Sequence, residues 1–269
     1  MARAAALLGA ARACATAGIV ACTSAGAPGG GVVIGGTAED RGMAGRAAAA
    51  RLERAIAAAG GVAALGRARA LAWDGEATVT AGGRVVRIAG RWLVQPPDTA
   101  VVETYDVTRG PAAARALVVA APRGWVVAGD SARPMPPALL ASERDELALY
   151  EAVRLLPLRA GARLTAIDAD TAGHPGLRAA RRGRPALELW FAPDGRLAHV
   201  AAEVAAADGG APVRQDLWLE GAVEGGGVRW PRRLRILQNG APFLDLTVTN
   251  FRALPRAEDP RLAGPGAGR

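Results

Sequence analysis

Few side chains in this sequence have the types and spacing that catalysis requires. His174 and His199 are the two histidines, and neither belongs to an HExxH motif or to another His–carboxylate pattern that binds a metal. Asp168 and Asp170 could form a carboxylate pair near a loop, but acidic residues at the end of a strand are usually solvated. There is no GxSxG motif and no glycine-rich phosphate loop. These patterns predict a protein that is not an enzyme and that uses no metal and no cofactor.

Cys22 is the reactive side chain with the most informative neighbours. Arg3 and Arg12 form a basic start, and the apolar run 13–21 is too short to span a bilayer, which is typical of an export signal. The residues from Ile19 to Cys22 resemble a bacterial lipobox. This resemblance implies cleavage before Cys22 and attachment of lipid to its thiol and new amino group, so the cysteine would not act as a nucleophile.

The lipobox resemblance divides the N-terminus into a removed signal, residues 1–21, and a Gly- and Ala-rich flexible tether, residues 22–45. Thr23, by resemblance to enterobacterial sorting rules, favours an outer-membrane lipoprotein that faces the periplasm. The alternatives are a plain secretory signal with a secreted or periplasmic product, and a chain that starts at Met43. Cys14 would be lost with the signal, which leaves no disulfide partner.

The composition is that of a folded protein with an unusual choice of basic residues. Of 269 residues, 51% are hydrophobic, which is ample for a core. The net charge of +8 comes from arginine without any lysine, which fits a GC-rich genome better than a phosphate-binding design. The densest basic stretch, 178–184, has no interleaved aromatic residues and is expected to be a solvated loop, with a patch for an anionic headgroup or a nucleic acid as the alternative. No nucleic-acid partner is expected.

The hydrophobic period changes from helical to strand-like near residue 71. Segment 45–61 has strong helix formers and ends in a glycine pair, which predicts a helix. From Leu71 onward apolar residues alternate with polar ones, as in Trp92 beside Arg91, so each segment has one dry and one wet face. About eleven such strands are joined mostly by short turns, which predicts one antiparallel meander and an α+β fold.

A single amphipathic helix is predicted near the middle of the chain, over residues 136–158. It has prolines at both ends and an apolar face, and it interrupts a sheet that is apolar on one side. We expect it to lie against the dry, concave face.

The order of these segments resembles the LolA/LolB-like lipoprotein carrier superfamily, including its LppX-type members. The motifs that carry the resemblance are GGVAALGRARAL (60–71), FAPDGRL (191–197), GGGVRWPRRLRI (225–236) and FLDLTVTNF (243–251). The resemblance covers residues 46–254 and implies one domain, a strongly curved, unclosed half β-barrel whose helix-covered concave side holds acyl chains. The Pro- and Gly-rich tail, 255–269, departs from the family and is expected to be disordered.

The expected function is that of a cell-envelope lipoprotein that binds an apolar ligand, the acyl chains of a lipid or a lipoprotein, for transport or sorting. Many inward positions are Ala or Gly, which favours an unfilled cavity, although a fully packed core is the alternative. The second hypothesis is an envelope assembly or scaffold lipoprotein that binds a protein partner, and a hydrolase is a third. The candidate cavity and lid residues are Trp73, Val79, Ile88, Trp92, Leu140, Leu147, Tyr150 and Val153. Trp218, on a wet face, is expected to be an ordinary exposed aromatic residue, with contact to a membrane surface or a partner as the alternative.

Overall fold

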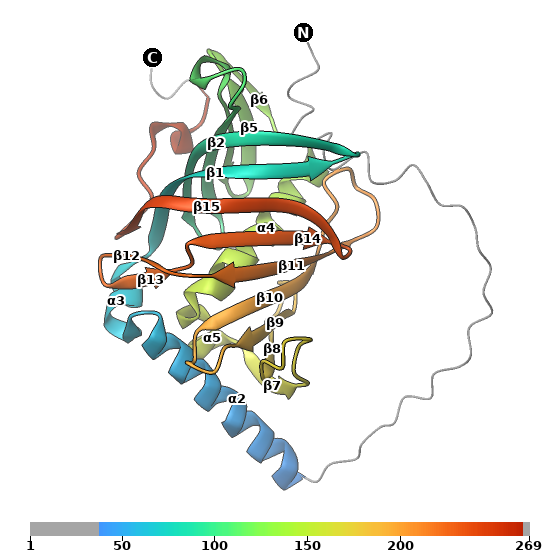
Figure 1. Cartoon of the computed structure of the whole chain (residues 1–269). Coiled ribbons are helices and arrows are strands. Elements are labelled where there is room, and N and C mark those ends of the chain that lie inside the picture. Colours follow the sequence, from blue (N-terminus) through green and yellow to red (C-terminus); the bar gives the residue numbers. More distant parts are fainter. Residues whose placement is uncertain (1–37, 266–269) are drawn as a thin grey trace, which may run out of the picture.

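The computed structural model describes residues 38–265, with side chains from residue 43 onward, and is built on one antiparallel sheet of 13 strands. The strands lie in the order β6-β5-β4-β3-β2-β1-β15-β14-β11-β10-β9-β8-β7 (Figure 1). Their bounds are β1 (Ala70–Ala81), β2 (Arg84–Gln95), β3 (Thr99–Asp106), β4 (Arg115–Ala120), β5 (Arg123–Ala128), β6 (Ser131–Pro134), β7 (Arg163–Ile167), β8 (Gly176–Ala180), β9 (Leu187–Phe191), β10 (Leu197–Val204), β11 (Val213–Glu220), β14 (Arg233–Gln238) and β15 (Ala241–Leu254).

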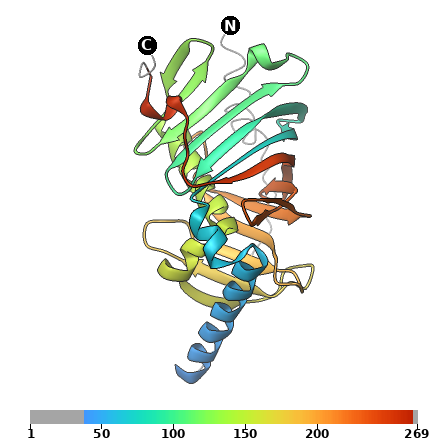
Figure 2. The ribbon, with the colours of Figure 1, turned by 90° about the vertical axis from the view of Figure 1, so that its left-hand side faces the viewer.

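The first and the last strand of this sheet in the sequence, β1 and β15, are neighbours at its centre. Ala70 of β1 pairs with Leu254 of β15, and the edge strands β6 and β7 do not pair with each other. The sheet curves strongly but stays open (Figure 2). The predicted α+β half-barrel with a single antiparallel sheet is therefore confirmed.

Two glycines allow the central strands to approach closely. Gly75 of β1 lies opposite Gly90 of β2. A Cβ atom on Gly90 would lie 2.1 Å from the backbone oxygen of Glu103, and one on Gly75 would lie 2.7 Å from that of Thr247. Because real side chains do not tolerate such contacts, only glycine fits where these backbones approach.

Four helices cover the concave face of the sheet: α2 (Ala38–Ala58), α3 (Gly61–Arg67), α4 (Pro137–Arg154) and α5 (Leu156–Gly161) (Figure 2). The main core lies between them and the sheet, and Leu52 and Ile56 of α2 and Leu147 of α4 are buried in it. The predicted position of the central helix is thus confirmed. No helix within residues 38–265 is both long and apolar enough to cross a bilayer.

Three features of the helices and strands differ from the sequence predictions. Helix α2 begins at Ala38, so it includes the last part of the tether expected over 22–45. All eleven expected strands form, but β6 and β8 were missed because β6 contains a proline and β8 is rich in alanine, a poor strand former. Pro231 separates β14 from a short strand that forms a second, two-stranded sheet, β12 (Val223–Gly225) with β13 (Val228–Trp230).

The tail beyond Leu254 was expected to be disordered, and its described part is not. It crosses the sheet and ends in a short 3-10 helix, η3 (Pro260–Ala263), seen in red beside the upper strands in Figure 2. Arg261 pairs with Glu103 of β3, and Leu262 packs on a small cluster that includes Val118 and Trp125. The prediction was wrong because it relied on the Pro and Gly content of the segment. The contacts of Arg261 and Leu262 hold the segment on the sheet, and composition does not reveal them.

Candidate functional site

A cluster of aromatic rings forms the centre of the core beneath α4. Trp73 of β1 stacks on Trp92 of β2 with ring centroids 6.3 Å apart, and it contacts Tyr150 of α4 at 5.7 Å. On its other side Trp73 meets Trp230 of β13 at 5.5 Å, and Trp230 stacks on Phe251. Trp73 and Trp92 thus lie on the apolar face, as the alternation of the strands predicted.

The indole N–H groups of Trp73 and Trp230 have no acceptor among the described residues. Trp73 is fully buried and Trp230 is 2% exposed. A buried donor without an acceptor costs about 1–3 kcal/mol. Two such donors in one apolar core are therefore candidates for contact with a ligand oxygen.

A small cavity of about 80 Å³ lies between α4 and the sheet. Five of the eight candidate residues line it: Val79, Ile88, Trp92, Leu147 and Tyr150. Trp73 lies behind its wall, through its stacking on Trp92 and Tyr150. The other two candidates do not line this cavity: Leu140 lies near Gly124, and Val153 lines a second cavity.

Polar contacts, several of them buried, hold α4 over this apolar centre. The backbone N–H of Ala205 donates to the carboxylate of Asp145 at 2.9 Å, and the amide of Gln215 donates to Glu146 at 3.0 Å. Arg181 makes two hydrogen bonds to the buried Glu151, and this carboxylate raises the pKa of the guanidinium. Arg181 belongs to the basic stretch 178–184, which is therefore partly strand β8 and partly an anchor for α4 rather than a solvated loop.

The second cavity, of about 290 Å³, lies between the C-terminal end of α2, the β9–β10 turn and β13. Its lining combines apolar residues, among them Trp230, with polar and charged side chains. Trp73 contacts Trp230, which lines the second cavity, and it contacts Trp92 and Tyr150, which line the first. It therefore lies between the two cavities. The full lining is Ala55, Ala58, Ala59, Val153, Leu155, His174, Ala192, Arg196, Leu197, Ala198, Leu219, Glu220, Gly221, Arg229, Trp230 and Pro231.

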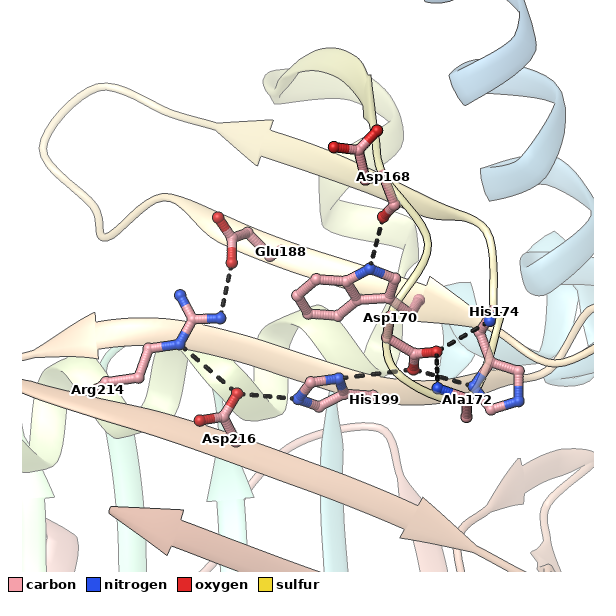
Figure 3. A network of polar contacts seen from close by, with 9 residues as sticks. Asp168, Asp170, Ala172, His174, Glu188, His199, Arg214 and Asp216 are labelled. Carbon is pink, nitrogen blue, oxygen red and sulfur yellow. Dashed lines mark hydrogen bonds and ion pairs between the residues drawn. The ribbon is translucent and has the colours of Figure 1, made fainter. Parts of the chain in front are cut away.

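The histidines and aspartates that the sequence analysis set aside meet on the convex face (Figure 3). The ring of His199 is stacked between Trp190, at 4.4 Å, and Trp218, at 4.0 Å. These three residues occupy paired positions on β9, β10 and β11. Sequence reasoning missed the stack because strand register was not known. Trp218 thus faces His199 and is half-buried rather than freely exposed.

Two carboxylates flank His199. Its Nε2 lies 3.0 Å from Asp216, and its Nδ1 lies 3.8 Å from Asp170. Partial burial acts to raise the pKa of Asp216, but the hydrogen bond with His199 and the charge of Arg214 outweigh it and hold that pKa below its ordinary value.

Asp170 is the buried anchor of the β7–β8 loop, with a side chain that is 4% exposed. It accepts backbone N–H groups from Ala172 and His174 and lies 3.0 Å from the ring of His174. Burial acts to raise its pKa, but these contacts hold the pKa below its ordinary value. Asp168 is exposed and contributes only its carbonyl, which accepts from Trp190 at 3.0 Å. The two aspartates therefore do not form a pair.

We interpret this network of histidine, aspartate and tryptophan side chains as structural. The ring of His199 is covered on both faces, and its side chain is 6% exposed. Within residues 38–265, no group of three or more His, Cys, Asp or Glu side chains is arranged to hold a metal ion. Cys22 lies outside the described residues.

Solved structures with a similar fold come from several bacteria, although no protein-family model and no curated protein matches the chain. A putative outer membrane lipoprotein-sorting protein domain from Vibrio parahaemolyticus superposes with a TM-score of 0.51 and 11% identity over 81% of this chain and 97% of its own. A DUF1329 family protein from Desulfovibrio piger gives 0.52 and 11% over the same shares. A LolA superfamily protein from Nitrosomonas europaea gives 0.51 and 12% over 80% and 96%. The chain therefore has a LolA-like fold.

Proposed function

We propose that this protein is a cell-envelope lipoprotein that binds acyl chains between α4 and the concave face of the sheet. The observation that carries the proposal is the construction of this region: an apolar, aromatic centre with unfilled volume, closed by a helix that polar contacts hold in place. The name of the Vibrio parahaemolyticus neighbour, a lipoprotein-sorting protein domain, supports a role in transport or sorting. No covalent catalysis is part of the proposal.

The size of the first cavity requires that α4 moves when a ligand binds. A pocket for a small molecule has about 300–1,000 Å³, whereas this cavity has about 80 Å³. Each buried methylene contributes about 0.8 kcal/mol, so an acyl chain of ordinary length offsets the loss of several polar contacts of α4. Displacement of α4 would join the two cavities along the aromatic cluster around Trp73.

Native mass spectrometry of gently purified protein tests the proposal. We expect adducts with the mass of one acyl lipid, and we expect organic extraction to remove them. A protein that carries no lipid, and that gains none when it is incubated with vesicles, would contradict the proposal.

We propose further that Cys22 carries the membrane anchor, with the cell envelope as the location. Replacing Cys22 with Ser removes the thiol to which a diacylglycerol would be attached. We expect the Cys22→Ser precursor to leave the membrane fraction, and unchanged membrane association would reject the anchor.

A scaffold lipoprotein that binds a protein partner is the second candidate. The close packing of the core favours it, since Trp73, Leu217 and Leu234 are almost completely buried and little volume remains beneath α4. The same mass measurement separates the two, because a scaffold would be free of lipid after any purification.

A further inference from the structure

The second cavity has a chemical character that the first one lacks. The first is lined mostly by apolar side chains, with Glu143 and Glu146 as its charged members. The second combines apolar walls with two arginines, Arg196 on the β9–β10 turn and Arg229 on β13. An amphiphile with a negative head would therefore find opposite conditions at the two ends of the core.

Both arginines keep terminal N–H groups that no described protein group accepts, and since their side chains are 42% and 47% exposed, these donors are open to solvent and accessible to a ligand. Arg196 uses its Nε to bind Asp194, and Arg229 uses Nε and one terminal nitrogen to bind Glu224. No partner for their remaining terminal N–H groups is found within residues 38–265. A guanidinium can hold two anions at once through its five donors, so these ion pairs leave room for a ligand.

The acidic residue in the same lining is already neutralised. Glu220 forms ion pairs with Arg233 and Arg235, both on β14. It therefore adds little repulsion toward an anion in the cavity.

A third donor comes from the wall of the cavity. Trp230 lines it, is 2% exposed, and has an indole N–H without an acceptor among the described residues. A ligand oxygen could satisfy this N–H at the point where the cavity meets the aromatic cluster.

We infer that the second cavity binds the head of an anionic acyl compound, with Arg196 and Arg229 at the charge and Trp230 at an oxygen next to the chain. The inference rests on the proposed acyl-binding function and specifies its ligand class. A carboxylate of a fatty acid and a phosphate of an acyl phospholipid share this chemistry.

Isothermal titration calorimetry with two ligands of equal chain length tests the inference. Dodecanoate and dodecanol are titrated below their aggregation limits into delipidated full chain carrying Cys22→Ser. We expect dodecanoate to bind at least about tenfold more tightly, because a charge-assisted hydrogen bond in a partly closed site contributes about that much. Equal binding would overturn the inference alone, whereas no binding of either ligand would overturn the proposed function as well.

Two variants assign the effect to residues. Arg196→Gln/Arg229→Gln should abolish the preference for dodecanoate and leave dodecanol binding unchanged. Arg87→Gln/Arg123→Gln, at exposed positions outside the second cavity, is the matched control and should keep the preference. Loss of affinity for both ligands in the first variant, or loss of the preference in the control, would overturn the assignment.

Trp230→Phe keeps an aromatic ring and removes the N–H. It should weaken both ligands by the same factor, about threefold to tenfold, because either oxygen can accept this bond. Unchanged affinity would overturn the role of Trp230. Lauroyl lysophosphatidylglycerol and glycerol monolaurate, which has the same chain but no phosphate, then separate the sources: an arginine-dependent preference for the phosphate-bearing compound identifies a phospholipid, and its absence, with the dodecanoate preference intact, identifies a fatty acid.

Discussion

The two faces of the sheet are made by the same strands, yet they differ in almost every physical property. On β2, Trp92 is buried in the aromatic cluster, whereas its neighbour Arg91 is largely exposed and pairs with Glu103. Period-two alternation separates them. Exposed ion pairs contribute little, typically below about 1 kcal/mol, so the stability of the sheet depends on its concave face.

The convex face has two regions that depart from this rule. One is the stack of Trp190, His199 and Trp218, and the other is the patch around Trp125 that η3 covers. Both are places where another segment, the β7–β8 loop or the tail, lies on the outer surface. In these two regions, large side chains on the convex face lie where the chain folds back onto itself.

A charge under α4 should produce the largest effect on either face. Leu147 is 3% exposed and lines the first cavity, so Leu147→Asp buries an unpaired carboxylate and should cost several kcal/mol. If α4 is a lid, bound lipid should be lost at a temperature where the sheet is still folded. Thermal midpoint and lipid content are measured together.

Ala141→Asp, on the exposed side of the same helix, is the control and should change neither quantity. A large drop in midpoint from a wild type that carried no lipid would favour the scaffold candidate.

A methyl group between the central strands should have the next largest effect. In Gly90→Ala the new Cβ would meet the backbone oxygen of Glu103, which cannot move without disturbing β3, so we expect destabilisation of about 3 kcal/mol. Gly45→Ala, with nothing within 4 Å, should be neutral or slightly stabilising. Urea denaturation of both variants measures the difference. An equal response would contradict the close approach of the strands.

Acid should weaken the convex network before it affects the concave face. The pKa values of Asp170 and Asp216 are lower than in the unfolded chain, so their stabilisation is present above the unfolded pKa of about 3.9 and is lost as pH falls through the folded values. Asp170→Asn should cost about 1–2 kcal/mol at pH 7 and reduce the loss of stability below about pH 4. Asp168→Asn is the control. Thermal midpoints of the wild type and both variants, measured between pH 7 and pH 2, test this prediction. Parallel curves for the wild type and Asp170→Asn would refute it.

The tail should give the smallest effect. Leu262→Ser removes part of the cover over Trp125, and we expect a loss of about 1 kcal/mol together with greater quenching of tryptophan fluorescence by acrylamide. Arg256→Gln, an exposed residue of the same segment, should leave both unchanged. If the two variants behave alike, the described contact of the tail contributes nothing in solution.

The alternation of apolar and polar residues predicted the faces of the strands but not their neighbours. Leu71, Trp73, Ala77 and Val79 all lie in the core as expected, because burial on one face is a local property of the sequence. The pairing of β1 with β15 depends on residues about 180 positions apart, such as Ala70 and Leu254, and no local pattern encodes it. Strand β8 was missed because alanine gives no clear alternation.

The candidate site was predictable to the extent that it is made of inward strand positions and one helix face. Trp92, Leu147 and Tyr150 met that condition and line one cavity. Val153 lies in the last turn of α4 and lines the other cavity together with Ala55 and Ala58 of α2. The second cavity itself combines a turn, a helix end and a short strand, and such a combination has no signature in any single segment.

The meeting of β1 and β15 at the middle of the sheet also sets the order in which the molecule can be assembled. Strands β1 to β6 can pair by short hairpins, and so can most of β7 to β15, but the two halves join only when the last long strand is present. Closing so long a loop is entropically costly and makes folding slow. A chain that stops before β15, which begins at Ala241, would hold two unjoined half-sheets with an open apolar face, which is the species most prone to aggregate during folding.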